Sequence, residues 1–219
     1  MVHYHRASAP AAALVAELNA RRSASAACLQ ADLRDIDSLP RLVAETVDRF
    51  GRLDALVNNA SSFFATPLGS IDQAAWDDLV GSNLKAPLFL TQAAAPHLLA
   101  AGGAVVNVTD IHAERPLAGY PLYCAAKAGL LGLTRALAIE LGPRVRVNAV
   151  APGPILWPEE EVFDDAERAA IVEHTLLKRA GCPQDVARAV HYLLEEATYV
   201  TGQTLSVDGG YAIAGVMDA

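Results

Sequence analysis

Asp110, Tyr123 and Lys127 are the residues whose types and spacing suggest proton transfer. Tyr123 and Lys127 are four positions apart, so on a helix both side chains lie on one face. A phenol has an ordinary pKa of about 10, and a neighbouring ammonium favours its ionised form, so Lys127 is expected to lower the pKa of Tyr123. The pair predicts that Tyr123 is a tunable general acid, with Asp110 acting thirteen residues before it.

The elements predicted around these residues follow a repeating β/α pattern. Apolar runs predict strands over residues 53–60, 104–109 and 145–150, and helical periodicity predicts a helix over residues 121–141. The second strand runs directly into Asp110, and the other two also end in polar residues or in a Pro-Gly break. We therefore predict an α/β fold, a doubly wound Rossmann-like parallel sheet in three α/β/α layers.

Several short motifs together resemble the short-chain dehydrogenase/reductase family, and the resemblance covers nearly all 219 residues. These motifs are Asn-Asn-Ala-Ser-Ser at 58–62, the single Asn83, Asp110, the Tyr123 and Lys127 pair, Pro152-Gly153 and Val-Asp-Gly-Gly at 207–210. The family ordinarily has a serine where this chain has Asp110, and its hydroxyl donates a hydrogen bond to a carbonyl oxygen. An ionised carboxylate only accepts hydrogen bonds, so Asp110 disfavours a simple ketone and suits a substrate edge that presents N–H groups.

The aspartate and two flanking motifs, Asn-Ala-Ser-Ser-Phe-Phe at 59–64 and Ile-His-Ala-Glu-Arg-Pro at 111–116, are similar to the bacterial pteridine reductase branch. This resemblance implies that Tyr123 delivers a proton to a pterin ring and that Asp110 bonds to the pterin and to Tyr123. It implies that Phe63 stacks on the flat pterin against the nicotinamide, and that Ser61 bonds to cofactor and substrate. Asn83 is implied to support a proton-relay water.

Some of these residues also have a plain structural interpretation. Phe63 is then a loop aromatic that covers the core, and Asn83 a polar interruption of a helix without a catalytic part. Cys124 and His112 lie beside the catalytic positions in the sequence, but adjacency alone does not aim side chains together, so we expect both to be structural. No histidine has metal-ligand spacing, and we predict no metal site.

The front of the chain departs most from the family pattern. Residues 1–6 resemble the family's second strand, and a helix is predicted from Ser8 to Arg21. A dinucleotide fold should instead open with a strand and a glycine-rich turn whose amides receive the pyrophosphate. We expect one domain over residues 1–219 that is truncated by one β-α unit, through a start placed too late or a trimmed chain, and that binds its cofactor weakly.

The cofactor is nevertheless predicted to be NADPH. Enzymes that use NAD usually have an acid at the end of the family's second strand, where this chain has Arg6. A guanidinium suits the 2′-phosphate of NADP, and Ser8 can add a hydroxyl donor. The alternative for Arg6 is a solvated charge at a strand end. By resemblance, Asp32 bonds to the adenine and Lys127 also holds the nicotinamide ribose. The full set of implied cofactor contacts is His5, Arg6, Ser8, Asp32, Asn59, Ala60, Ser61, Tyr123, Lys127, Pro152 and Gly153.

Residues 154–158, with the acidic residues that follow them, look like the family's mobile substrate loop. Closure of such a loop excludes water, and Trp157 is the residue best able to form a wall of the substrate site. The family often has a threonine after the Pro-Gly pair, but here Pro154 has no backbone N–H to donate. The carboxamide of the nicotinamide must therefore find other partners.

Composition indicates a soluble, cytoplasmic enzyme. Hydrophobic residues make up 53% of the chain, and a net charge of −8 with a pI near 5.2 disfavours nucleic acids and anionic membranes as partners. Three scattered cysteines without C-x-x-C spacing suggest a reducing compartment. The uncharged stretch 86–109 is interrupted by polar residues and proline, so we predict no membrane span. The resemblance to the family implies that the protein forms a homo-oligomer, a tetramer.

The leading hypothesis is an NADPH-dependent pteridine reductase that transfers hydride to a C=N bond of a pterin or folate, such as dihydrobiopterin, dihydromonapterin or dihydrofolate. A short-chain ketone or 3-oxoacyl reductase is the first alternative, and it calls for a neutral donor at position 110. A non-catalytic protein that binds a pterin or a partner is the second, and it predicts no interaction with NADPH.

Overall fold

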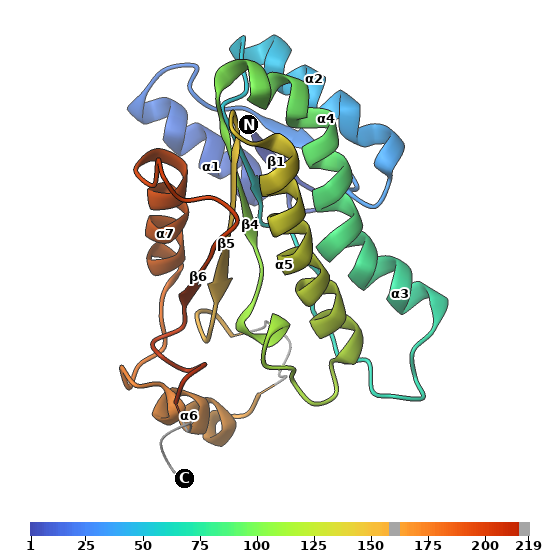
Figure 1. The fold of residues 1–219 in the computed structure, drawn as a ribbon, viewed down its shortest axis with the longest axis vertical. Helices are drawn as coiled ribbons and strands as arrows, with labels where there is room; N and C mark the ends of the chain where they lie inside the picture. The colour runs from blue at the N-terminus through green and yellow to red at the C-terminus, as the bar shows by residue number, and fades with distance from the viewer. Residues whose placement is uncertain (158–162, 215–219) are drawn as a thin grey trace.

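The computed structural model describes residues 1–157 and 163–214, which alternate between strands and helices (Figure 1). The strands are β1 (Val2–Tyr4), β2 (Cys28–Gln30), β3 (Ala55–Asn58), β4 (Ala104–Val108), β5 (Arg146–Pro152) and β6 (Thr204–Val207). The helices are α1 (Ser8–Arg21), α2 (Leu39–Phe50), α3 (Gln73–Val80), α4 (Ala86–Ala101), α5 (Pro121–Leu141), α6 (Asp165–His174) and α7 (Pro183–Glu195). A π-helical turn, Gly81–Lys85, joins α3 to α4, and a 3₁₀ turn, Ile111–Ala113, follows β4.

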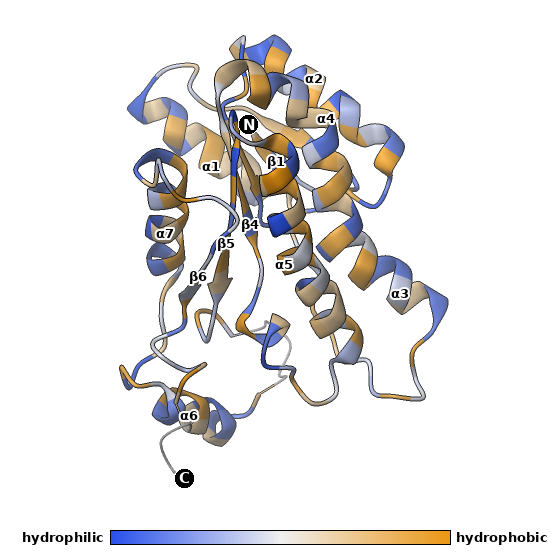
Figure 2. Cartoon of the chain, viewed as in Figure 1, coloured by the Kyte–Doolittle hydropathy of each residue, from blue (hydrophilic) through white to orange (hydrophobic). Residues whose placement is uncertain are grey.

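All observed strand pairs are parallel, and helices cover both faces of the sheet, which confirms the predicted Rossmann-like class. The helices α2, α4 and α5 lie on one face, and α1 and α7 lie on the other (Figure 1). Apolar residues gather on the strands and on the helix faces turned toward them (Figure 2). The α1 and α5 helices begin and end where the sequence predicted, whereas β3 is shorter than the apolar run 53–60, because pairing with β4 ends at Asn58.

The sheet is divided into two parts. β1 pairs with β2, and the other four strands pair in the order β3-β4-β5-β6, but no strand among the described residues lies between β1 and β3. A cavity of about 390 Å³ separates these two edges, with walls from β1, β3, α2 and α4. Val57 on β3 is 39% exposed at this edge. The gap lies where the first strand of the family pattern, which is central in the sheet, was expected to be missing from this chain.

A buried apolar layer beneath the gap contains residues of α2 and α4. Leu39, Leu42 and Val43 of the α2 region pack in one cluster with Leu90 and Leu98 of α4. This cluster also includes buried residues of β4 and β5, so the two helices rest on the main sheet. Helix packing therefore covers part of the surface that sheet pairing leaves open.

One helix in the described part of the chain, α5, is long and apolar enough to span a membrane. In this structure it packs against β5 and the 3₁₀ turn, and half of its most apolar stretch is buried. It also contains the buried charge of Lys127. These features are those of a core helix.

Val57→Thr and Val106→Thr form a matched test of the open edge. The two valines are partners in the β3–β4 register, yet Val106 is fully buried while Val57 borders the cavity. A hydroxyl buried without a partner is costly, so we expect Val106→Thr to lower the free energy of unfolding by about 1–3 kcal/mol and Val57→Thr to lower it much less. Urea unfolding measures both, and equal losses would mean that the β3 edge is covered in solution.

Candidate active site

Asp110 and Tyr123 meet beyond the carboxyl end of β4. The Tyr123 hydroxyl donates a hydrogen bond to Asp110 Oδ2 at 2.6 Å, and the other carboxylate oxygen accepts the backbone N–H of His112 at 2.8 Å. Tyr123 is only 4% exposed, in the first turn of α5. The structure thus brings Asp110 and Tyr123 into direct hydrogen-bond contact, as the resemblance implied.

Lys127 connects the same helix to β4. Its Nζ donates a hydrogen bond to the carbonyl oxygen of Val108 at 2.9 Å, and the side chain is almost fully buried. The ammonium lies 5.7 Å from the centroid of the Tyr123 ring. Lys127 therefore acts on Tyr123 across space and through the position of the helix.

The pKa values differ from the sequence expectation. Burial, and then the negative charge of Asp110, raise the pKa of Tyr123 above its ordinary value. Burial lowers the pKa of Lys127 to about 8, against the opposing effect of Asp110. The expectation that Lys127 lowers the pKa of Tyr123 is wrong for this structure, because burial and the nearer carboxylate dominate. Tyr123 is therefore protonated at neutral pH.

An aromatic cluster lines this site. Phe63 stacks on Tyr120, with ring centroids 4.7 Å apart and planes inclined by 7°, and it meets the Tyr123 ring edge to face at 4.8 Å. Phe63 thus lies beside Tyr123, and its stacking on a pterin stays a prediction. Sequence reasoning missed Tyr120, although its position three residues before Tyr123 puts it one helical turn away on the same face.

Asn83 lies in the π-helical turn and supports the loop that carries Phe63. Its Nδ2 donates hydrogen bonds to the carbonyl oxygens of Ser62 and Leu79, both at 2.9 Å, and the residue is 1% exposed. Its buried Oδ1 has no hydrogen-bond partner among the described residues. The proton-relay role stays a prediction, and the observed contacts give Asn83 a role in positioning the loop.

A second site lies at the carboxyl end of β1. A pocket of about 260 Å³ is lined by His5, Arg6, Asp32, Ser61 and Ser62, among others. Two potentially cationic side chains and two hydroxyl groups are donors suited to a phosphate ester.

Ser8 does not line this second pocket. It is exposed and begins α1, so its predicted phosphate contact has no support in this geometry. Asn59 and Ala60 do lie in the expected region, since they line the neighbouring cavity between β1 and β3.

Asp32 is engaged by a residue that the sequence analysis did not single out. The guanidinium of Arg34 binds both of its carboxylate oxygens, and His5 Nε2 lies 3.6 Å away. The hydrogen bond from Arg34 is the largest cause of a shift that lowers the pKa of Asp32 to about 2. The spacing of an acid and an arginine two residues apart was the available signal for this pair.

β5 ends at Pro152, two residues beyond the predicted end at Val150, and Gly153 follows it. The Gly153 N–H donates to the carbonyl of Val207 at 3.0 Å, and a Cβ on Gly153 would lie 2.6 Å from Cβ of Asp208. Only glycine fits this close approach of the two strand ends. Their predicted cofactor contacts stay predictions.

Trp157 meets Phe163 edge to face at 6.0 Å, and the guanidinium of Arg168 on α6 lies 5.7 Å from its ring. The acidic part of the predicted substrate loop at 159–161 lies outside the described residues. Trp157 is therefore held against α6 beyond the carboxyl ends of the strands, and its role as a wall of the substrate site stays a prediction. Within residues 1–157 and 163–214, no group of three His, Cys, Asp or Glu side chains is placed to hold a metal ion.

Comparison with known proteins identifies the class. A family model described as Enoyl-(Acyl carrier protein) reductase matches residues 1–212. Pteridine reductase 1 of Leishmania tarentolae is 36% identical over 255 aligned positions, which cover 97% of this chain and 87% of the relative. The 3-oxoacyl-[acyl-carrier-protein] reductase FabG of Staphylococcus aureus is also 36% identical, over 95% of this chain and 86% of the relative.

A solved structure agrees with the fold. The blue fluorescent protein from a metagenomic library, in complex with NADPH, superposes with a TM-score of 0.89 at 36% identity, over 96% of this chain and 86% of the other. The chain belongs to the short-chain dehydrogenase/reductase family, whose members are NAD(P)-dependent oxidoreductases. Pteridine and oxoacyl reductases are equally similar to it, so identity alone does not choose the substrate.

The buried ammonium of Lys127 gives a test of this site through stability. Between pH 8 and 10 the folded lysine loses its proton while the unfolded one, with an ordinary pKa of 10.5, keeps it. The unfolded state then binds more protons, so the free energy of unfolding is expected to rise with pH over this range by about 2 kcal/mol. Urea unfolding at several pH values should show the rise in the wild type and in the exposed control Lys85→Met. Its persistence in Lys127→Met would assign the rise to another group.

Proposed function

We propose that this protein is an NADPH-dependent reductase that transfers hydride to a C=N bond of a pterin or folate. The observation that carries the proposal is the 2.6 Å hydrogen bond from Tyr123 to Asp110, which puts a carboxylate beside the proton donor. A carboxylate accepts hydrogen bonds and repels a developing alkoxide, so it suits a heterocycle with N–H groups better than a ketone.

The aromatic cluster supports a flat substrate. Phe63 is held by stacking on Tyr120 and lies beside the Tyr123 ring. A planar bicyclic ring that stacks on an aromatic side chain gains about 0.5–1.5 kcal/mol beyond its buried area. A pterin next to Phe63 would also be within reach of Asp110 and Tyr123, whereas an extended acyl chain would gain little from this surface.

The residues present fit two parts of NADPH. The pocket with His5 and Arg6 has the donors that a 2′-phosphate needs, and Ser61 lines this same pocket. The resemblance to the family assigns the nicotinamide ribose to Lys127 and Tyr123. When bound, NADPH supplies the hydride. The described residues contain no glycine-rich turn at the gap between β1 and β3, so the pyrophosphate has no evident cradle among them.

The chain's own residues would manage the proton. Tyr123 is buried and stays protonated because its pKa is raised, so a proton is present for the substrate nitrogen. The raised pKa opposes release of that proton, and a substrate N–H that takes the place of the hydroxyl on Asp110 would offset this cost. Asp110 would accept an N–H of the substrate and hold the ring in register. Lys127 would fix the helix through Val108 and place a positive charge near the phenolate that forms.

A 3-oxoacyl reductase is the second candidate function. It is supported by the similarity to FabG, which equals the similarity to the pteridine reductase. The chemistry at position 110 opposes it, because a ketone oxygen needs a neutral or positive donor there. A 3-oxoacyl reductase would therefore require either a protonated Asp110 or another residue that donates to the ketone oxygen.

Replacement of Tyr123 by phenylalanine tests the proton donor. The ring and its packing remain while the hydroxyl is lost, so we expect kcat for dihydropterin reduction to fall by about 10²–10⁴-fold. The fully exposed Tyr199→Phe is the matched control and should leave kcat unchanged. NADPH oxidation followed by absorbance measures both, and a normal kcat for Tyr123→Phe would refute the assigned role.

Asp110→Ser distinguishes the two substrates. We expect the wild type to reduce a dihydropterin and not a 3-oxoacyl thioester, and Asp110→Ser to lose pterin turnover because the acceptor for the substrate N–H is gone. Asp110→Asn, which keeps the size of the side chain, should also lose most of it. The oxoacyl reductase would be favoured if the wild type reduces the thioester. It would also be favoured if the wild type has no pterin activity and Asp110→Ser gains a large thioester activity. No NADPH binding by the wild type would favour a non-catalytic protein.

A further inference from the structure

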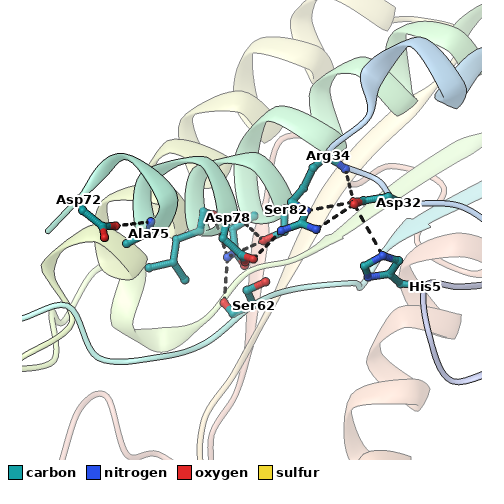
Figure 3. A network of polar contacts seen from close by, with 10 residues as sticks. His5, Asp32, Arg34, Ser62, Asp72, Ala75, Asp78 and Ser82 are labelled. Carbon is teal, nitrogen blue, oxygen red and sulfur yellow. Dashed lines mark hydrogen bonds and ion pairs between the residues drawn. The ribbon is translucent and has the colours of Figure 1, made fainter.

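Arg34 lies at the centre of a cluster of charged residues beside the second pocket (Figure 3). Its Nε and Nη2 donate to the two carboxylate oxygens of Asp32 at 3.0 and 2.8 Å. Its remaining terminal nitrogen, Nη1, donates to Oδ2 of Asp78 at 2.8 Å. One guanidinium therefore joins two carboxylates that are 46 positions apart in the sequence.

These two carboxylates belong to different parts of the fold. Asp32 follows β2 and His5 and Arg6 follow β1, the two strands of the smaller sheet, whereas Asp78 lies in α3. The two sheets share no strand pairing within the described residues. Arg34 is thus a side-chain connection across the divided sheet, at a place where no backbone ladder fixes the distance.

The contacts continue from Asp78 to the active-site loop. The carbonyl oxygen of Asp78 accepts the hydroxyl of Ser82 at 2.7 Å, and Asn83 Nδ2 lies 3.3 Å from the same hydroxyl oxygen. Asn83 then donates to the carbonyl oxygen of Ser62, the residue before Phe63. Figure 3 shows this succession from His5 and Asp32 through Arg34 to Ser62.

We propose that Arg34 is a positioning residue that couples the end of the cofactor site bearing His5, Arg6 and Asp32 to the loop that carries Phe63. Arg34 holds the Asp32 carboxylate with two hydrogen bonds and joins it to Asp78 of α3. The binding of a 2′-phosphorylated adenosine and the placement of the loop that carries Phe63 therefore depend on one side chain. This inference rests on the proposed function, since it takes the pocket at β1 to be the adenosine end of the NADPH site.

Two further observations support a geometric role for Arg34. The second carboxylate oxygen of Asp78 is buried without a hydrogen-bond partner among the described residues, so Arg34 provides the charge that offsets this carboxylate. The stem of Arg34 lies against Gly81 at the start of the π-helical turn, where a Cβ would be 3.4 Å from Arg34 Cγ. The three side chains are between 32 and 38% exposed, and ion pairs at that exposure add little to stability. Position, rather than stability, is what the arrangement provides.

The chain contains a matched control for this cluster. Arg52 also binds an aspartate two residues away, Asp54, through Nε and Nη2, but this pair is more exposed and lines none of the pockets described above. Arg52→Gln therefore removes a comparable pair without touching the proposed connection. Arg34→Lys keeps the charge but not the fork, since an ammonium is a point charge.

The test measures binding of adenosine 2′,5′-bisphosphate by calorimetry, and kcat and KM for NADPH with a saturating dihydropterin. We expect Arg34→Gln to weaken binding of the bisphosphate by about 5–20-fold, with Arg34→Lys restoring only part of it. Asp78→Asn, which leaves the Arg34–Asp32 fork in place, should lower kcat severalfold with little change in bisphosphate affinity. Arg52→Gln should match the wild type in every measurement.

Several outcomes would overturn the inference. If Arg34→Gln and Arg52→Gln bind the bisphosphate equally, or if Arg34→Gln changes only the urea midpoint, Arg34 positions nothing. If Asp78→Asn keeps the wild-type kcat, the link to the loop that carries Phe63 is absent. If the wild type binds the bisphosphate but reduces no pterin, the proposed substrate fails while the role of Arg34 at the cofactor site can still be measured. If the wild type does not bind the bisphosphate, the proposed cofactor site is wrong, and this inference with it.

Discussion

The hydrogen bond from the buried ammonium of Lys127 to the carbonyl of Val108 is the constraint from which the active site follows. A buried ammonium must be hydrogen-bonded, and this one finds its acceptor on the last residue of β4. Asp110 comes two residues after that acceptor, and Tyr123 comes one helical turn before the lysine. Once Lys127 and Val108 are joined, the strand end and the helix start are brought together, and the Tyr123 hydroxyl meets Asp110. The contact between Tyr123 and Asp110 is therefore a consequence of how a charge is buried.

The divided sheet makes side-chain contacts more important than they are in a continuous one. In the four-stranded part, backbone ladders fix β3, β4, β5 and β6, and buried amides reinforce them, as in the bond from Asn58 to Asn107 and from Asn107 to Thr134. Between β1 and β3 no such ladder exists among the described residues. The connection is left to helix packing around α2 and to Arg34. The half of the site that is proposed to hold the adenosine is thus fixed by fewer and more exposed contacts than the half that holds the proton donor.

Much of this could be predicted from the sequence, and the failures have physical causes. The α5 helix follows from periodicity, which is a local property of the chain, and the contact of Asp110 with Tyr123 was implied by the resemblance to the family. The pKa of Tyr123 was predicted in the wrong direction because burial and distance decide it, and neither can be read from the Tyr-x₃-Lys spacing. The stacking of Phe63 on Tyr120 and the bond from Arg34 to Asp78 join residues that are far apart in the chain. No periodic pattern marks such pairs, so they appear only when the fold is known.

The same hydrogen bond that identifies the site also bears on which substrate it takes. Tyr123 has one hydroxyl proton, and in this structure it forms a hydrogen bond to Asp110 Oδ2. To deliver that proton elsewhere, Tyr123 must leave this carboxylate oxygen without a donor, which is unfavourable unless the substrate supplies one. A heterocycle with an N–H beside its acceptor nitrogen does both, since it satisfies Asp110 Oδ2 and receives the proton. A ketone offers only an acceptor and leaves Asp110 Oδ2 without a donor, while Oδ1 keeps the His112 N–H. The charge state at position 110 therefore links proton delivery to the choice of substrate, and this is the physical reason to prefer a pterin over an oxoacyl group when overall similarity favours neither.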